Sequence, residues 1–304
     1  MRRLLRSVAT AGAIAFAVLC FTIGILAGNL PRVAGRADVR ERRELDLPAA
    51  ALLRLNNPDG SVHVRAREMD GIHLQASINA YVSPGEDRRI AQDYVASLIC
   101  ATLDGSTLDV VTEPGERPDA VDVRVDYTIL APLGTDVAIE GCNGNVWVSK
   151  GCGRVSVAGR NTDIEVVEPG GPVVAESTNG RIRVMDAPEG ATIRTVNGNV
   201  YAHMLGGPLE ATTTNGAIVA HVLDPEVRAC DLSSRNGGIT LVMREDWSAQ
   251  VEAVTERGVV KSDFPVDSAS GVRRRRHLRG TIGKGDTMLR MHTLNGNIWI
   301  ARSD

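Results

Sequence analysis

Apolar and polar positions alternate through the second half of the chain, and the alternation restarts at a fixed spacing. Each unit opens on an asparagine, and the first five asparagines are separated by four successive intervals of eighteen residues. The third position after the asparagine is β-branched and the fifth is apolar, as in a short strand with one buried face. The asparagines are Asn143, Asn161, Asn179, Asn197, Asn215, Asn236 and Asn295, and the third positions hold Val146, Ile164, Ile182, Val200, Ile218, Ile239 and Ile298.

A second apolar alternation follows within each unit, after a break rich in glycine and proline. Two folds explain two short strands and a turn per unit. The Asn-Gly pairs favour an antiparallel meander, because this dipeptide is typical of tight hairpins. The return of one residue type at one offset favours a parallel β-solenoid, in which coils stack about 4.8 Å apart and equal side chains hydrogen-bond along a column.

We therefore predict an all-β fold in which residues 142–304 form a parallel β-solenoid with about 18–21 residues per coil. The asparagine column is expected to point into a buried corner of the coils. Residues 44–141 lack the period but keep short alternating strands, and their one helical stretch, near residues 86–99, is expected to cap the sheets. The apolar face of that helix holds Ile90, Tyr94 and Leu98.

The N-terminus carries an uncharged run of 25 residues, from Ser7 to Pro31. A helix needs roughly 20 apolar residues to cross a bilayer, so residues 1–31 predict a transmembrane helix that anchors the protein through residues 7–31. A cleaved signal peptide is the alternative, because arginines precede the run, and it would make the protein secreted. A basic linker, residues 32–43, follows.

The formal charge of −3 hides a division along the chain. Residues 1–43 hold eight arginines against Asp38 and Glu41, so the remaining body carries a formal charge of −9. An acidic body repels phosphate backbones, which disfavours a nucleic-acid partner. In an oxidising compartment Cys142 and Cys152 could form a disulfide, and the alternative is that both remain small buried thiols.

Familiar catalytic motifs are missing from the sequence, including a nucleophile elbow, a P-loop and the HExxH zinc motif. His203 and His221 are eighteen residues apart, but no third metal ligand accompanies them. The arginines from Arg273 to Arg276 are clustered, which indicates either a charged hairpin tip or a contact with anionic lipid or cell-wall polymer. We therefore predict no enzyme, no cofactor and no metal site. The candidate binding residues are exposed aromatic rings in the outward column between the two apolar columns, and they are Trp147, Tyr201 and Trp299.

Three stretches carry a resemblance to a known family. They are Thr128 to Ser149, the repeated TNG or VNG followed by Ile or Val, and the closing run Gly280 to Ala301. Together they make residues 45–302 resemble the bacterial β-strand-repeat proteins known as putative adhesins. The resemblance implies an N-terminal signal or anchor, a solenoid-like body and a place at the cell envelope, with the body on the periplasmic or extracellular side of the cytoplasmic membrane.

These observations together predict a single-pass membrane protein that acts as a non-catalytic envelope-associated scaffold or adhesin-like binding protein. Its expected partner is an envelope protein or a polysaccharide. Two other hypotheses stay open: a sensory or regulatory partner of another envelope protein, and a carbohydrate-active enzyme on the same architecture. An enzyme would need a groove in which acidic or basic groups converge.

Overall fold

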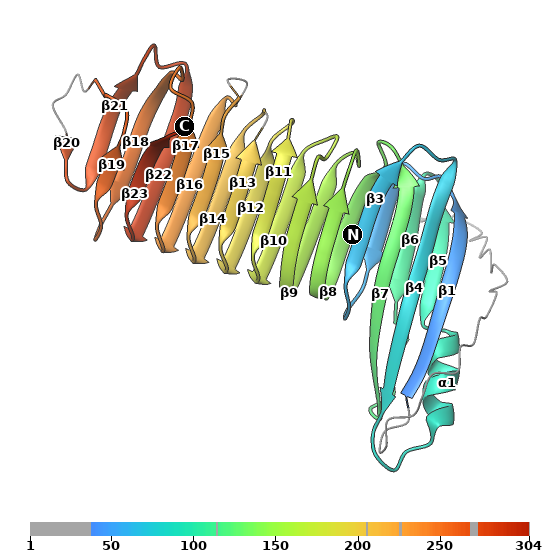
Figure 1. Ribbon diagram of the computed structural model, residues 1–304. Coiled ribbons are helices and arrows are strands. Elements are labelled where there is room, and N and C mark those ends of the chain that lie inside the picture. Colours follow the sequence, from blue (N-terminus) through green and yellow to red (C-terminus); the bar gives the residue numbers. More distant parts are fainter. Residues whose placement is uncertain (1–37, 114, 205, 225–226, 268–272, 304) are drawn as a thin grey trace, which may run out of the picture.

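The computed structural model describes residues 38–113, 115–204, 206–224, 227–267 and 273–303, which form 23 strands and one helix (Figure 1). The fold is all-β apart from that helix. The N-terminal strands and helix are β1 (Asp38–Pro48), β2 (Leu52–Asn56), β3 (Val62–Arg67), β4 (Gly71–Val82), α1 (Arg88–Ala96), β5 (Ile99–Asp104), β6 (Thr107–Thr112) and β7 (Val121–Pro132).

The central part of the chain, residues 136–243, is a regular stack of coils that we name the repeat stack. Each strand pairs in parallel with the equivalent strand of the next coil, so Ala175 lies beside Ile193 and Ile193 beside Ala211. Its strands are β8 (Asp136–Ser149), β9 (Val155–Val167), β10 (Val173–Asn179), β11 (Ile182–Ala187), β12 (Ala191–Asn197), β13 (Val200–Met204), β14 (Leu209–Asn215), β15 (Ile218–Val222), β16 (Ala229–Asn236) and β17 (Ile239–Met243).

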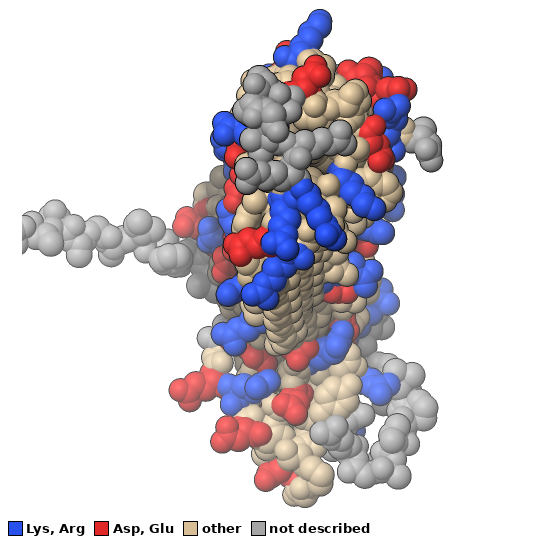
Figure 2. Space-filling model, turned by 90° about the vertical axis from the view of Figure 1, so that its left-hand side faces the viewer, with Lys and Arg blue, Asp and Glu red and all other residues tan. Residues whose placement is uncertain are grey.

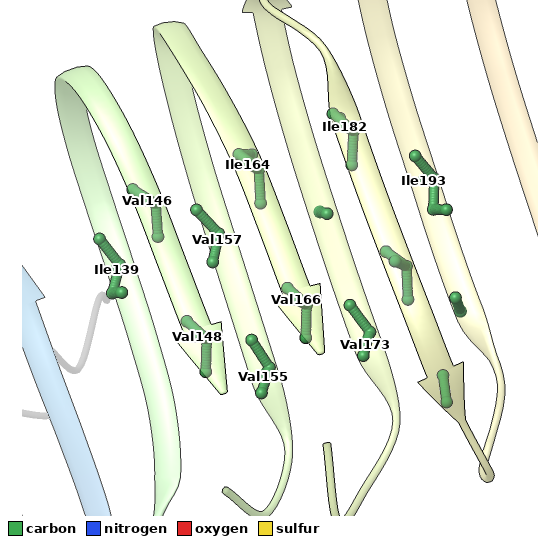
Figure 3. Close-up of a cluster of buried hydrophobic side chains, with 14 of the residues drawn as sticks. Ile139, Val146, Val148, Val155, Val157, Ile164, Val166, Val173, Ile182 and Ile193 are labelled. Carbon is green, nitrogen blue, oxygen red and sulfur yellow. The ribbon is translucent and has the colours of Figure 1, made fainter. Parts of the chain in front are cut away.

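Each coil has two layers that meet at its asparagine. Strands before the asparagine form one layer, the pre-Asn face, and strands after it form the other, the post-Asn face; β8 and β9 bend through the corner and belong to both. The inward side chains of the two layers form a thin apolar core (Figure 3). Because the layers are so close, small and β-branched residues fill the space without large aromatic rings.

The Asn-Gly corner is not a hairpin turn. The glycines after the asparagines have ordinary negative φ values, whereas an Asn-Gly hairpin requires positive ones. What requires glycine is the close approach of successive coils: a Cβ at Gly216 would lie 1.9 Å from the carbonyl oxygen of Gly198. The corner is therefore specified by stacking between coils.

A buried hydroxyl column lies two residues before five of the asparagines and before Arg257. Thr195 donates to the carbonyl of Gly180 at 3.1 Å, and Thr213 donates to that of Gly198 at 3.0 Å. The same bond is made by Ser177, Ser234, Thr255 and Thr293 to neighbouring carbonyls. These bonds satisfy carbonyl groups at the tight corner that the turn itself leaves available.

The prediction of a parallel β-solenoid is wrong for the fold, because the strands form a mixed sheet. At the N-terminal end β4 pairs antiparallel with both β1 and β7, and β5 pairs antiparallel with β6. At the other end β21 pairs antiparallel with β18 and β20. Antiparallel strands cover the edges that a purely parallel stack would leave open to other chains. The C-terminal strands are β18 (Ala249–Thr255), β19 (Val260–Ser262), β20 (Arg273–Arg274), β21 (His277–Ile282), β22 (Thr287–Asn295) and β23 (Ile298–Arg302).

Chain order and spatial order differ at both ends. Strands β22 and β23 lie between the coil of β16 and β17 and the coil of β18 and β19, although they come last in the chain. Strands β2 and β3 likewise lie between β6 and β7 on one side and β8 on the other. At the C-terminal end the chain thus forms the outermost coil first and returns to fill the gap. At the N-terminal end β2 and β3 come first, and later strands are added on both sides of them.

Helix α1 packs beside β1 and β4 at the N-terminal end (Figure 1). Asp87 caps it by accepting a hydrogen bond from the backbone N–H of Arg89, and Ala91 and Val95 are its buried residues. Of the expected apolar face, Leu98 is fully buried and Tyr94 packs against the core, whereas Ile90 is 36% exposed and Ala91 is buried in its place. The buried Arg43 of β1 donates to the carbonyl of Val95 and ties the helix to the sheet.

The expected transmembrane helix falls on residues 7–31, which lie outside the described residues. Within the described ranges, no helix has the length and apolar composition needed to cross a bilayer.

Candidate binding surface

One outward column of side chains runs along the whole post-Asn face, and we name it the outer row. Parallel pairing in register places the fourth residue after each asparagine beside its equivalent in the next coil. In spatial order the outer row is His63, Trp147, Glu165, Arg183, Tyr201, Val219, Thr240, Trp299 and Lys261.

The three candidate aromatic residues all belong to this row, at equal intervals. Trp147 and Tyr201 are three coils apart, and Tyr201 and Trp299 are again three coils apart. With coils about 4.8 Å apart, successive rings lie about 14 Å from each other. The rings therefore do not converge on one site but mark a straight line along one face.

Neighbouring side chains hold two of the rings in place. The ring of Trp147 stacks on that of His63, with 4.1 Å between centroids and 29° between planes. The guanidinium of Arg183 lies 5.1 Å from the centroid of Tyr201. Trp299 is 46% exposed, and its ring N–H donates to Asp263 at 3.1 Å. Each ring is oriented by a polar neighbour while part of it stays open to solvent.

A shallow hollow of about 130 Å³ lies beside Trp147. Two ion pairs cross it, from Arg181 to Asp163 at 3.9 Å and from Arg183 to Glu165 at 3.8 Å. The Asp163 carboxylate also accepts the backbone N–H of Arg181 at 2.7 Å. The lining residues are Asn145, Trp147, Asp163, Ile164, Glu165, Arg181 and Arg183.

The histidine pair His203 and His221 lies next to Tyr201. The two imidazole centroids are 6.2 Å apart, and Nδ1 of His203 is 2.7 Å from a carboxylate oxygen of Asp186. Burial, followed by the charge of His203, lowers the pKa of His221. Within the described ranges, no group of three or more His, Cys, Asp or Glu side chains is arranged to hold a metal ion.

The described cysteines lie away from this surface. Cys152 is a free, buried thiol, and burial raises its pKa to about 11. Burial also raises the pKa of the free thiol of Cys230. Thiols with raised pKa values stay protonated at neutral pH, so these two are packing residues and not nucleophiles.

The arginine run forms a hairpin at the end of the molecule opposite α1. Strand β20 pairs with β21 there, and Arg275, Arg276 and Arg279 are exposed. Figure 2 looks at this end and shows Lys and Arg side chains gathered on it. Charges on an edge hairpin oppose pairing with a strand of another chain.

The asparagine column lies in a different environment from the one expected. From Asn161 onward, each amide donates to the side-chain oxygen of the asparagine in the adjacent coil, as from Asn197 to Asn179 at 2.7 Å. This ladder is exposed and does not fill a buried corner. Its remaining bonds run from Asn161, Asn179, Asn215, Asn236 and Asn295 to Asn143, Asn161, Asn197, Asn215 and Asn236.

The buried hydroxyl column was missed in the sequence, although its signal is present there. Serine or threonine stands two residues before five of the seven asparagines, and glycine stands there before Asn143 and Asn161. The stacking of His63 on Trp147 had no local signal, because it depends on the pairing of β3 with β8.

Comparisons with known proteins place this chain in no established family. No protein-family model matches the sequence, and no curated protein matches it. Among solved structures, it is similar to a putative adhesin from Bacteroides fragilis, with 12% identity, a TM-score of 0.45, and coverage of 87% of this chain and 97% of that one. It is also similar to a putative lipid binding protein from Parabacteroides distasonis, with 9% identity, a TM-score of 0.36, and coverage of 85% and 96%. A putative cell adhesion protein from Clostridium sporogenes shows 11% identity, a TM-score of 0.23, and coverage of 88% and 100%.

Proposed function

We propose that this chain is a non-catalytic, adhesin-like binding protein of the bacterial cell envelope and that its outer row contacts an extended partner. The observation that carries the proposal is the equal spacing of Trp147, Tyr201 and Trp299 along one face. A polymer that lies along the row can meet all three rings, whereas a compact small molecule can meet only one.

The mechanism is additive contact on a rigid surface. Each ring offers an apolar face to a sugar or to a partner side chain, and one such contact alone is weak. Three contacts on one chain gain affinity together, because the second and third form within a complex that the first has already made. The hydrogen-bonded stack holds the rings at fixed spacing, so little order has to be created on binding.

The arrangement of charges favours binding over catalysis. An enzyme on this architecture needs acidic or basic groups that converge on one bond. Along the outer row, Glu165 instead lies within ion-pair distance of Arg183 in the next coil. The carboxylate of Asp163 is bound in the same way by Arg181.

Attachment to the cytoplasmic membrane through residues 7–31 is part of the proposal. The expected result is that the full chain stays in the membrane pellet after an alkaline carbonate wash, since a spanning helix of roughly 20 apolar residues resists extraction. Soluble protein with a new N-terminus between Ala27 and Gly35 would instead identify a cleaved signal peptide.

The test of binding uses the full chain and envelope polysaccharide. The polysaccharide is purified from the bacterium that encodes this chain and is immobilised on beads. Joint replacement of Trp147, Tyr201 and Trp299 by alanine should lower retention at least tenfold. The matched control replaces three outward residues of the pre-Asn face, Thr192, Thr212 and Met288, by alanine and should leave retention unchanged. Equal retention of both triple variants would contradict the proposal.

A second set of variants distinguishes a scaffold from an enzyme. Alanine at any one of five polar positions should change retention by no more than a few fold, because no single polar group holds the partner. Complete loss of activity in one folded variant would favour the enzyme. The positions are Glu165, Asp186, His203, His221 and Arg276.

A further inference from the structure

The geometry points to the hollow beside Trp147 as a subsite for one neutral sugar residue of the extended partner. This inference rests on the proposed function, because it names the chemical class of the partner at one of the three rings. It is based on the positions of Trp147, Asp163 and Glu165.

Trp147 provides a platform of which one side is already occupied. His63 stacks on one side of the indole at 4.1 Å, and in the outer row the coil of Glu165 lies on the other side of Trp147. The hollow is lined by the indole, by side chains of that coil and by Arg181 and Arg183 of the next one. An indole held in this way offers a flat apolar surface whose orientation is set before the ligand arrives. The C–H face of a pyranose ring stacks well on such a surface.

The polar wall of the hollow fits hydroxyl groups better than a charged ligand. Its two carboxylates and two guanidinium groups balance in charge, so a free anion or cation meets no excess of opposite charge. The ion pairs, at 3.8 and 3.9 Å, are longer than hydrogen bonds. Their donors and acceptors can therefore bond to neighbouring hydroxyl groups, which donate and accept at once.

The size of the hollow indicates one unit of a longer chain. Sites that enclose a whole small molecule usually measure about 300 to 1,000 Å³, and this hollow measures about 130 Å³. Arg183 lines the hollow and its guanidinium also lies 5.1 Å from the centroid of Tyr201, so the hollow borders the next ring of the outer row. The subsite and the line of rings thus fit the same partner, an extended chain of sugar residues.

Two other hollows of the described residues lack this combination. A hollow of about 200 Å³ between β18 and β21 contains polar groups and Met288 but no aromatic ring. A hollow of about 250 Å³ contains Trp247, which is only 6% exposed and so presents little of its ring.

The experiment is saturation-transfer NMR on the full chain in a detergent without a sugar headgroup. The probes are the methyl β-glycosides of glucose, galactose, mannose and N-acetylglucosamine at millimolar concentration, with methyl glucuronide as a charged comparison. At least one neutral glycoside should receive saturation on its ring protons, and the glucuronide should bind no more tightly than the neutral probes.

Variants locate the binding. Trp147→Ala should weaken it at least tenfold. Asp163→Asn combined with Glu165→Gln should weaken it about threefold, since both changes weaken polar contacts that water can partly replace at an open site. Met288→Ala, which removes an exposed apolar side chain of the pre-Asn face, is the control and should bind as the unchanged chain does. Trp147→Phe keeps a flat ring and should retain part of the affinity, which separates loss of the platform from loss of the fold.

Three results would overturn the inference: no transfer to any neutral glycoside, unchanged binding by Trp147→Ala, or an equal loss in Met288→Ala. Retention on envelope polysaccharide, measured in parallel, separates this failure from failure of the proposed function. If glycosides do not bind but the triple alanine variant of Trp147, Tyr201 and Trp299 still loses retention, only the inference of a sugar subsite is wrong. If retention does not depend on the three rings, the proposed function is wrong.

Discussion

The repeat stack and the C-terminal end use the same column chemistry but differ in chain order. In the stack, Asn197 bonds to Asn179, eighteen residues before it. At the end, Asn295 bonds to Asn236 across 59 residues, and Thr255 donates to the carbonyl of Gly296, which comes 41 residues later. The asparagine, glycine and hydroxyl columns therefore specify which coils stack, and the eighteen-residue spacing is only their simplest consequence.

The N-terminal end keeps one of these columns and loses another. A Cβ at Gly144 would lie 2.4 Å from the carbonyl oxygen of Gly60, so the close approach of backbones continues into β2 and β3. The asparagine ladder stops there, because Asp59 stands beside Asn143, whose amide donates to the carbonyl of Pro58 at 3.2 Å. Close packing thus extends further along the molecule than the amide ladder.

The strongest test of this comparison is Gly216→Ala. Its Cβ would meet the Gly198 carbonyl at 1.9 Å, and because both groups are backbone, whole coils must shift. We expect the free energy of unfolding to fall by about 3 kcal/mol in urea titrations. The matched control is Gly115→Ala in the N-terminal segment, where no atom lies within 4 Å of the added carbon. Equal effects of the two changes would remove the case for a glycine column set by close packing.

Thr213→Val tests the hydroxyl column at the same carbonyl. The change keeps the shape of a side chain that is 2% exposed but removes its 3.0 Å hydrogen bond to Gly198. The loss should be about 1 to 2 kcal/mol of unfolding free energy. Thr212→Val, on the outward side of the same strand, should change it by less than about 0.5 kcal/mol. A neutral Thr213→Val would mean that the column only fills space.

Asn197→Ala removes two ladder bonds, to Asn179 and from Asn215, each 2.7 Å long. Because the ladder is exposed, water partly replaces these bonds, and we expect a loss of about 1 kcal/mol. Arg194→Ala, whose ion pairs with Glu176 and Glu210 are also exposed, should cost less than about 0.5 kcal/mol. Similar costs for the two variants in thermal unfolding would show that the ladder adds no stability beyond that of an ordinary surface contact.

Much of the column structure could be predicted from the sequence, because parallel strands in register turn a period in the chain into a line in space. That reasoning placed Trp147, Tyr201 and Trp299 in one outward column. It could not place β22 and β23 between two earlier coils, since the same inward residues satisfy either order of stacking. The exposed ladder was mistaken for a buried one because polar residues that recur so strictly are expected to be enclosed.

The hollow beside Trp147 had to come from the structure for a related reason. Its platform depends on His63, which reaches Trp147 only because β3 pairs with β8. That pairing follows from the return of the chain through β4, α1 and β5 to β7. No local pattern around His63 encodes this path.

The smallest expected effect concerns pH and separates the two regions by their histidines. Burial lowers the pKa of His221 from its ordinary value of 6.5, and the charge of His203 lowers it further. Burial also lowers the pKa of His63, but Asp126 opposes that shift. Well above pH 6.5 both imidazoles are neutral in the folded and unfolded chains, so they contribute no pH dependence there. As the pH falls through 6.5, the unfolded chain takes up protons first, and stability decreases until the folded pKa is reached.

The melting temperature should therefore drop slightly between about pH 7.5 and about pH 5.5, and His221→Gln should remove more of that drop than His63→Gln. A larger change from His63→Gln would place the pH-sensitive contact at the N-terminal end and not in the repeat stack.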